Sequence, residues 1–404
     1  MGIRSRILFL SATIIASIFG FFLSSPKPNL RTTTRVHRVK MATSRIASSL
    51  KLCRSVLAKS SEAISEINAS RPKPKIANKL DWLSNFSELI PDTFTIDNLE
   101  YRPRSGTVSG QLVLRLLEQK GQQFIDEEVN RAHAASVDRV PSMTQSIKPQ
   151  GRLAAERRNV YATVAAKLAD QVSGKVSLEV DPRVSHDAKL VMEEVQELAR
   201  ILHDNGVEVK SKILFKIPGT WEGILAAKML TLQQEFGCQV THVYSMAQAT
   251  AAADAKVAVI QPYVGRINDW YRANPSKVPR ELETSNYGVN LVKKIYNFVK
   301  KYDMESKVVA ASIRNVDEAI ALAGIDYMIL SPSLIRSLAA LPGSFGPPAL
   351  SPEGAGSAGF TPQDVRGYEL GECAEELLKA SVTSAGATVD KVEEVLANTA
   401  IGNM

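Results

Sequence analysis

The chain has 404 residues, of which 45% are hydrophobic and 23% charged, a balance typical of a globular protein with one large core rather than of a disordered chain. Its formal net charge of +7 comes from the N-terminal part, because residues 1–60 contain eleven Lys and Arg but no Asp or Glu. Subtracting these eleven charges from +7 leaves −4 for residues 61–404, so we do not expect the folded part to bind nucleic acid.

The N-terminal part has two regions that are typical of targeting sequences. Ile7–Leu23 is apolar and resembles the core of a signal peptide or a short anchor, since a full membrane span needs about 20 apolar residues. Arg31–Ser61 is basic and rich in Ser, Thr and Ala, as transit peptides are. Together they predict import into a plastid, with residues 1–70 as leader and linker and no stable membrane association of the mature protein. The alternatives are translation from Met41 and a cytoplasmic location.

Strands and helices alternate regularly after this leader. We expect the ordered part to begin at Leu80–Leu89, with short strands at Glu88–Pro91 and near Thr107 and a long helix at Arg152–Asp170. Six further strands are predicted at Val176–Val180, Ile213–Ile217, Cys238–Tyr244, Val257–Tyr263, Val308–Ser312 and Tyr327–Leu330. Helices are predicted between them, with Ser185, Thr220 and Asn315 as N-caps.

This alternation predicts an α/β fold with right-handed βαβ units and a parallel sheet. Eight such units over residues 76–341 favour a closed (β/α)8 TIM barrel over an open sheet, and no GxGxxG or GxxxxGK[ST] motif follows a strand. Residues 342–360 are rich in Pro, Gly and Ser and are predicted to be a linker. The C-terminal extension, residues 361–404, is expected to form two helices that pack on the barrel or on a partner chain, so a homodimer is an open prediction.

One predicted strand, in the run Ile213–Gly223, carries a lysine in an apolar setting. Strand parity places Lys216 on the same face as Leu214, so inside a barrel its ammonium would be desolvated and its pKa lowered. A neutral amine near pH 7 can attack a carbonyl and form a Schiff base. The other interpretation is a lysine that reaches solvent from the strand end, and this stretch alone does not separate the two.

Other polar residues occur near the C-terminal ends of the predicted strands, where the active site of such a barrel lies. Glu179 is expected to face inward and could move protons for a Schiff base, with a water held by Thr241. A second carboxylate, Asp92, could take a proton from a substrate hydroxyl and so drive cleavage of a carbon–carbon bond. Three groups could grip a phosphate by charge-assisted hydrogen bonds: Arg266, Ser312 and Arg314.

The strand motifs resemble those of the transaldolase family. The likeness is carried by VSLEVDPR (Val176–Arg183), ILFKIPGTWEG (Ile213–Gly223), THVYSMAQA (Thr241–Ala249), VIQPYVGRINDWY (Val259–Tyr271), ASIRN (Ala311–Asn315) and DYMILSP (Asp326–Pro332), with a weaker match at Pro91–Thr93. The resemblance implies the roles given above for the lysine, the two carboxylates, the threonine and the phosphate-binding groups. It also implies transfer of a dihydroxyacetone unit between sugar phosphates, from sedoheptulose 7-phosphate to glyceraldehyde 3-phosphate, without a cofactor or metal ion.

Four positions depart from the family pattern. Ser109 and Gln239 stand where asparagines are usual, Gln261 where a serine is and Tyr263 where a phenylalanine is. Related fructose 6-phosphate aldolases carry a tyrosine at the place that matches Tyr263. An aldolase that releases dihydroxyacetone, and a barrel that only binds sugar phosphates, are therefore alternatives, although a binding protein has no need for a buried amine with two carboxylates.

Overall fold

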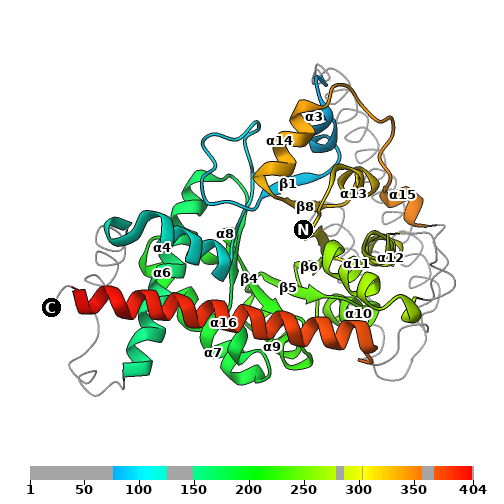
Figure 1. The fold of residues 1–404 in the computed structure, drawn as a ribbon. Helices are drawn as coiled ribbons and strands as arrows, with labels where there is room; N and C mark the ends of the chain where they lie inside the picture. The colour runs from blue at the N-terminus through cyan, green and yellow to red at the C-terminus, as the bar shows by residue number, and fades with distance from the viewer. Residues whose placement is uncertain (1–75, 125–148, 279–285, 303, 357–367, 403–404) are drawn as a thin grey trace, which may run out of the picture. The chain divides into compact units, whose positions relative to one another are not determined.

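Eight parallel strands alternate with helices in the part of the chain that the computed structural model describes, residues 76–124, 149–278, 286–302, 304–356 and 368–402. The strands are β1 (Glu88–Pro91), β2 (Gly106–Val108), β3 (Val176–Glu179), β4 (Ile213–Pro218), β5 (Cys238–Val243), β6 (Val259–Pro262), β7 (Lys307–Ala310) and β8 (Tyr327–Leu330). They pair in the order β1-β8-β7-β6-β5-β4-β3-β2, and β1 also contacts β2, so the sheet curls into a nearly closed barrel (Figure 1). The predicted (β/α)8 barrel is confirmed, while the predicted leader lies outside the described residues.

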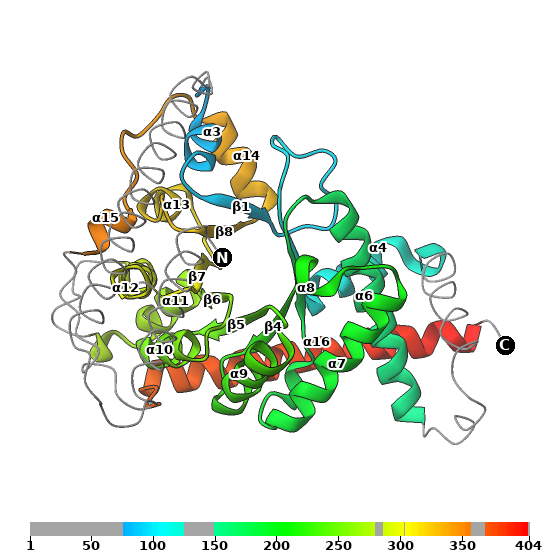
Figure 2. The same cartoon turned by 180° about the vertical axis from the view of Figure 1, so that it is seen from behind.

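Helices follow the strands and lie outside the barrel (Figures 1 and 2). Those between β2 and β8 are α4 (Gly110–Phe124), α6 (Pro149–Gln171), α7 (Ala188–Asp204), α8 (Val209–Lys212), α9 (Trp221–Gln234), α10 (Met246–Asp254), α11 (Val264–Ala273), α12 (Tyr287–Lys301) and α13 (Val316–Ala321), with 3-10 turns η3 (Pro182–Val184) and η4 (Pro275–Lys277). α3 (Lys79–Ser84) precedes β1, and β8 is followed by α14 (Pro332–Ala340), α15 (Pro352–Ala355) and α16 (Glu372–Gly402). Thr220 and Asn315 cap α9 and α13 as predicted. Within the described ranges no helix is long and apolar enough to cross a membrane.

The helix after β3 begins later than predicted. Ser185 does not cap it but ends the 3-10 turn η3, and Asp187 caps α7 by accepting from two backbone N–H groups of its first turn. The cause is Pro182, which starts a 3-10 turn capped by Asp181 and so delays the α-helix.

Four predicted strands run past their observed ends, β3 and β5 by one residue each and β6 and β7 for reasons seen in the backbone. β7 stops at Ala310, because Ser312 has a φ of 57° and this left-handed backbone does not continue a strand. β6 begins at Val259 and ends at Pro262, since Tyr263 is already the N-cap of α11. Ser312 and Tyr263 therefore lie just beyond the strands, at the C-terminal end of the barrel.

The barrel has an apolar interior below its C-terminal end. Leu214 forms a small buried cluster with Ile90, Val259 and Val309, one residue from each of four strands, inside the barrel. The larger core fills the space between the sheet and the helices. Leu214 and Lys216 share a strand face, so the lysine stands directly above this apolar layer, as parity predicted.

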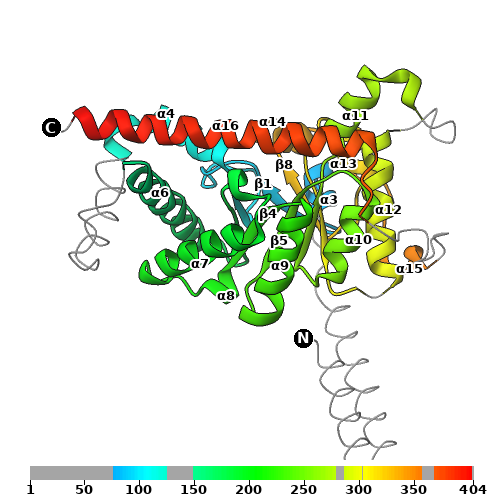
Figure 3. The same cartoon turned by 90° about the horizontal axis from the view of Figure 1, so that it is seen from below.

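The segment after β8 packs more closely than a linker would. In the predicted linker, Leu350 is buried and its N–H donates to Ala323 O at 2.9 Å, while the Trp82 indole donates to Gly346 O at 2.9 Å. The prediction of two tail helices is wrong, because α16 is one helix from Glu372 to Gly402; residues 357–367 lie outside the described ranges. α16 contacts α4, η3 and α11, which follow β2, β3 and β6, so it crosses the C-terminal end of the barrel (Figure 3).

Candidate active site

Lys216 lies at the centre of the C-terminal end of the barrel and is 4% exposed. β3 and β4 pair in register with Glu179 beside Lys216, and the lysine Nζ lies 4.0 Å from Glu179 Oε2. The same Nζ donates to Thr107 Oγ1 at 3.2 Å. Burial lowers the pKa of Lys216, although the negative charges of Glu179 and Asp92 oppose the shift. The amine is thus desolvated rather than exposed at the strand end, which favours the Schiff-base interpretation.

Glu179 is held from two sides. Its Oε1 accepts from the Gly110 N–H at 3.1 Å, and its Oε2 faces Lys216. Burial raises the pKa of Glu179, opposed by the charge of Lys216 and by the Gly110 hydrogen bond. Gly110 permits this approach, because a Cβ there would lie 2.9 Å from the Tyr161 hydroxyl and 3.2 Å from Glu179 Oε1. A carboxyl with a raised pKa beside an amine with a lowered pKa suits proton exchange between them.

A pocket of about 340 Å³ opens above this pair. It brings together nine of the eleven residues predicted for the site: Asp92, Ser109, Glu179, Lys216, Gln261, Tyr263, Arg266, Ser312 and Arg314. Asp92 follows β1 directly, and its backbone N–H donates to Leu330 O at 2.8 Å. Ser109 accepts from the Leu112 N–H at 3.4 Å, at the start of α4.

The other two, Gln239 and Thr241, do not line this pocket but are hydrogen-bonded to residues that do. The Thr241 and Tyr263 hydroxyls share a hydrogen bond of 3.1 Å, and Gln261 Nε2 donates to the Tyr263 hydroxyl at 3.3 Å. Gln239 Nε2 in turn donates to Gln261 Oε1. Burial raises the pKa of Tyr263, so the phenol stays protonated and can serve as a donor. Three of the four residues that depart from the family pattern thus form one connected chain that ends at Thr241, while Ser109 lies apart from it.

Arg266 provides a partly buried positive charge on one side of the pocket. Its Nη1 donates to Ser381 Oγ of α16 at 2.6 Å and approaches the Tyr244 hydroxyl at 3.5 Å, and its guanidinium lies 5.1 Å from the centre of the Tyr263 ring. Among the residues that the structure describes, no carboxylate forms an ion pair with Arg266. Its charge is therefore available for an anionic ligand.

A second guanidinium lies nearby at the rim. Arg314 Nε donates to Ser312 Oγ at 3.2 Å, and Arg314 Nη2 pairs with Asp269 Oδ2 at 3.1 Å. The left-handed backbone of Ser312 turns the chain so that its hydroxyl and the arginine meet. Together with Arg266, these groups supply the donors that a phosphate needs.

Several pocket residues were missed in the sequence. They are Thr107, Gln111, Arg115, His242, Ser381, Ser384 and Thr388. Thr107 lies on a three-residue strand, too short to show alternation, and the last three belong to α16, which lies far along the chain from the strand motifs. A run of small polar residues in the tail was the available signal, because a helix that lies close over a barrel needs small side chains there.

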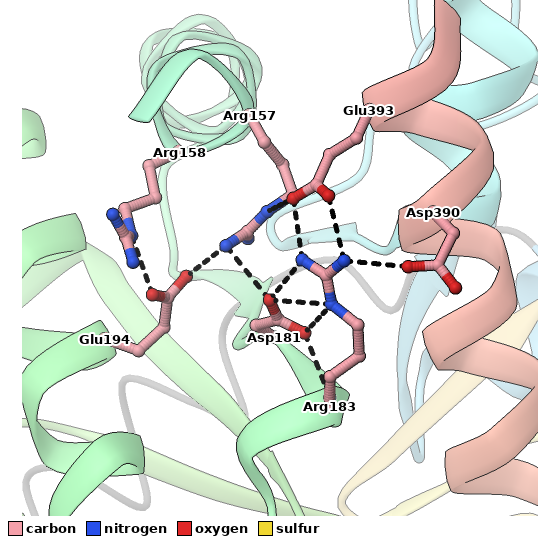
Figure 4. Close-up of polar contacts among 7 residues, drawn as sticks. All are labelled: Arg157, Arg158, Asp181, Arg183, Glu194, Asp390 and Glu393. Atoms are coloured by element: carbon pink, nitrogen blue, oxygen red, sulfur yellow. Dashed lines mark hydrogen bonds and ion pairs between the residues drawn. The ribbon is translucent and has the colours of Figure 1, made fainter. Parts of the chain in front are cut away.

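An ion-pair cluster fixes α16 over the pocket (Figure 4). Arg157 of α6 is 1% exposed and its guanidinium contacts Asp181 at 3.1 Å, Glu194 at 3.0 Å and Glu393 at 3.0 Å. Burial alone would raise the pKa of Asp181, but Arg183 and Arg157 outweigh it and hold that pKa below its usual range. The cluster therefore joins α16 to the segment directly after Glu179.

The described His, Cys, Asp and Glu side chains form no group of three or more that could hold a metal ion. The pocket is lined by an amine, two carboxylates, three guanidinium groups, an imidazole, amides and hydroxyls.

Comparisons with known proteins agree with this geometry. Residues 111–396 match the family described as Transaldolase/Fructose-6-phosphate aldolase. The chain is 35% identical over 269 residues to the transaldolase of Mannheimia succiniciproducens, which covers 65% of this chain and 80% of that protein. It is 32% identical over 268 residues to the transaldolase of Bos taurus, covering 66% and 76%, and 36% identical over 266 residues to that of Haemophilus influenzae, covering 65% and 80%. The chain therefore belongs to the transaldolase/fructose-6-phosphate aldolase family.

Proposed function

We propose that the chain transfers a dihydroxyacetone unit from a ketose phosphate such as sedoheptulose 7-phosphate to an aldose phosphate such as glyceraldehyde 3-phosphate. The observation that carries this proposal is the buried amine of Lys216, 4.0 Å from the carboxylate of Glu179 and in one pocket with Asp92. These are the groups that imine formation and carbon–carbon cleavage require.

The first half of the reaction breaks the donor. Lys216 Nζ attacks the C2 carbonyl, and Glu179 moves the protons as the carbinolamine loses water to give the imine. Asp92 takes the proton of the C4 hydroxyl, the C3–C4 bond breaks, and its electron pair passes into the imine to give an enamine. The shortened aldose phosphate then leaves.

The second half repeats these steps in reverse. The enamine attacks the carbonyl of the acceptor, Asp92 returns its proton to the new hydroxyl, and water hydrolyses the imine with Glu179 moving the protons. Arg266, Ser312 and Arg314 bind the phosphate of donor and acceptor alike. One phosphate site for both substrates places each reacting carbon near Lys216.

Borohydride reduction tests this mechanism. Incubation with fructose 6-phosphate and borohydride should add a three-carbon unit to the peptide that contains Lys216, as measured by mass spectrometry. Lys216→Ala should abolish the label, whereas Lys210→Ala, at an exposed lysine paired with Glu235, should retain it. A label that persists in Lys216→Ala contradicts the proposal.

A second activity, release of free dihydroxyacetone, is supported by one contact. The Tyr263 hydroxyl is hydrogen-bonded to Thr241, the residue expected to hold the hydrolytic water. A phenol at this place can bind or orient that water, which favours hydrolysis of the intermediate before an acceptor arrives. We therefore propose transfer as the main reaction, with slow aldol cleavage beside it.

We also propose that the protein acts in a plastid. The support is the acid-free basic leader, which precedes the described barrel. Residues 1–75 fused to a fluorescent protein should direct it to plastids, and a purely cytosolic signal would contradict this. Sedimentation of the protein without that leader would test the homodimer that the sequence leaves open.

A further inference from the structure

β5 breaks the strand alternation at its C-terminal end. Its pairing with β6 shifts register between Val240 and Val243, and His242 has a φ of 56°. Regular alternation from the inward Thr241 would turn His242 toward the helices. With the left-handed residue the strand forms a bulge, and His242 lines the active-site pocket. Left-handed backbone is uncommon for a histidine, and such strain is found most often at functional sites.

A buried glutamine holds this bulge in place. Gln248 Nε2 donates to His242 O at 3.0 Å and to Gly219 O at 2.8 Å, and Gln248 Oε1 accepts from the Tyr244 N–H at 2.8 Å. The side chain is fully buried, and both ends of its amide are used. The backbone groups that the bulge removes from the sheet are thereby satisfied, so the orientation of His242 is fixed before any ligand binds.

The imidazole of His242 is enclosed by protein but does not use all of its hydrogen-bonding groups. His242 is 6% exposed, its Nδ1 has no hydrogen-bond partner, and its ring centre lies 5.5 Å from that of Tyr263. Burial, assisted by the positive charges of Arg266 and Lys216, lowers the pKa of His242 to about 3. The ring is therefore neutral at physiological pH, with one nitrogen that donates and one that accepts. Because Nδ1 is covered by protein, Nε2 is the nitrogen that can meet a ligand in the pocket.

We propose that His242 binds the substrate, through a hydrogen bond to the hydroxyl between the cleaved bond and the phosphate group. This inference rests on the proposed function. The ketose carbonyl must reach Lys216 and the phosphate must reach Arg266, so the carbon chain passes along the pocket wall between these two residues. His242 lines the same pocket as both residues, and its ring packs 5.5 Å from the Tyr263 ring, whose centre lies 5.1 Å from the Arg266 guanidinium. In fructose 6-phosphate the hydroxyl at this place is the one on C5.

A pair of donors that differ in this single hydroxyl tests the proposal. We would measure kcat/KM for fructose 6-phosphate and for 5-deoxyfructose 6-phosphate, with erythrose 4-phosphate as acceptor. The two sugars differ in their ring forms in solution. We therefore compare between protein variants the ratio of kcat/KM for fructose 6-phosphate to kcat/KM for 5-deoxyfructose 6-phosphate. His242→Leu should reduce the wild-type ratio by roughly tenfold, the effect of one lost hydrogen bond in a closed site. His242→Asn should keep most of it, because asparagine offers hydrogen-bonding groups and tolerates left-handed backbone.

A matched control separates the contact from backbone strain. Lys256 has a φ of 57° and is exposed at the end of α10, outside the pocket. Lys256→Leu therefore places a leucine in the same backbone conformation, and it should leave the ratio unchanged. If His242→Leu does not fold, His242→Ala takes its place with the same expected loss.

Three results would count against the inference. An unchanged ratio in folded His242→Leu or His242→Ala would show that the ring only fills space. A ratio lost equally in His242→Asn would mean that no hydrogen bond is involved. Wild-type protein that neither transfers nor forms the borohydride adduct at Lys216 would overturn the proposed function and this inference together, whereas normal transfer with no dependence on His242 overturns this inference alone.

Discussion

Arg183 and Glu393 form a bidentate ion pair, with Arg183 Nη2 donating to Glu393 Oε1 at 2.6 Å and Arg183 Nη1 donating to Glu393 Oε2 at 2.9 Å. Arg183 lies in η3, shortly after β3, and Glu393 lies on α16, so this pair joins the strand that carries Glu179 to the helix that crosses the pocket. Paired planar groups of this kind fix orientation as well as distance. The position of α16 over Lys216 therefore depends on charge pairing as much as on apolar packing.

The first prediction follows from this pair. Arg183→Met should reduce the free energy of unfolding by about 1–3 kcal/mol, because Asp181 and Glu393 each lose a partly buried partner. The KM for sugar phosphates should rise, since α16 is less firmly held. Arg200→Met, which breaks surface pairs with Glu197 and Asp204 on α7, is the control and should change stability by at most about 0.5 kcal/mol. Denaturant unfolding measures the stability of both variants. Equal losses of stability in Arg183→Met and Arg200→Met would contradict the structural role of Arg183.

The second prediction concerns Ser381, whose hydroxyl contacts both Arg266 at 2.6 Å and the Tyr244 hydroxyl at 2.6 Å. Ser381→Ala removes both contacts and leaves the guanidinium less well oriented for a phosphate. We expect the KM for fructose 6-phosphate to rise about tenfold, with a smaller effect on kcat. Ser384→Ala, at an exposed serine on the same helix that also lines the pocket, is the control. Steady-state kinetics with phosphorylated and unphosphorylated donors would show the defect only with the former if the interpretation is correct.

The third prediction concerns the pH dependence of imine formation. The attacking group is the neutral amine of Lys216, so the trapping rate should rise with pH through the lowered pKa of this lysine and level off above it. The charge of Glu179 raises that pKa, so Glu179→Gln should lower it further and move the rise to lower pH. The plateau rate should fall by about 10²-fold or more, since the proton shuttle is lost.

Borohydride trapping across a pH series measures this shift. Glu197→Gln changes an exposed carboxylate on the outer helix α7 and should leave the profile unchanged. A rise that moves to higher pH in Glu179→Gln would show that the carboxylate does not act on Lys216 as we describe.

The fourth prediction concerns the balance between transfer and hydrolysis. Tyr263→Phe removes the hydroxyl that is hydrogen-bonded to Thr241 and Gln261. One lost hydrogen bond at the water is about 1 kcal/mol, so release of dihydroxyacetone from fructose 6-phosphate should fall several-fold while transfer to erythrose 4-phosphate stays largely intact. A coupled assay for free dihydroxyacetone, run with and without acceptor, measures both. If the wild type releases none, or the variant releases as much, the phenol has only a packing role.

The barrel could be predicted from sequence because its strands are buried apolar segments, bounded by residues that end strands and begin helices. Thr220 ends the β4 connection and caps α9, and Tyr327–Leu330 was predicted with its observed bounds. The single tail helix could not be predicted, since Ser, Thr and Gly at residues 381–388 are typical of a break between helices. In the structure this stretch faces the barrel, where small side chains allow close approach, and a Cβ at Gly386 would lie 3.2 Å from the Arg183 side chain.

The residues of the site also include some that the sequence could predict and some that it could not. Lys216 and Glu179 are adjacent in register on neighbouring strands, so strand parity alone was enough to bring them together. Parity failed for His242, because a bulge reverses the direction of its side chain. Ser381 was missed as well, because the run of small polar residues in the tail does not show that the path of α16 brings this serine to Arg266.

The path of α16 also has a consequence for the order in which the active site is assembled. Ser381 is translated after all eight strands, and 165 residues separate it from Lys216 (381 − 216). At roughly 5–20 residues per second, about 8–33 s pass on the ribosome between the synthesis of Lys216 and that of the serine that contacts Arg266. A nascent chain therefore carries Lys216 and Arg266 well before the serine that contacts the arginine, and a chain that ended before α16 would keep both residues but lack the Ser381 hydrogen bond.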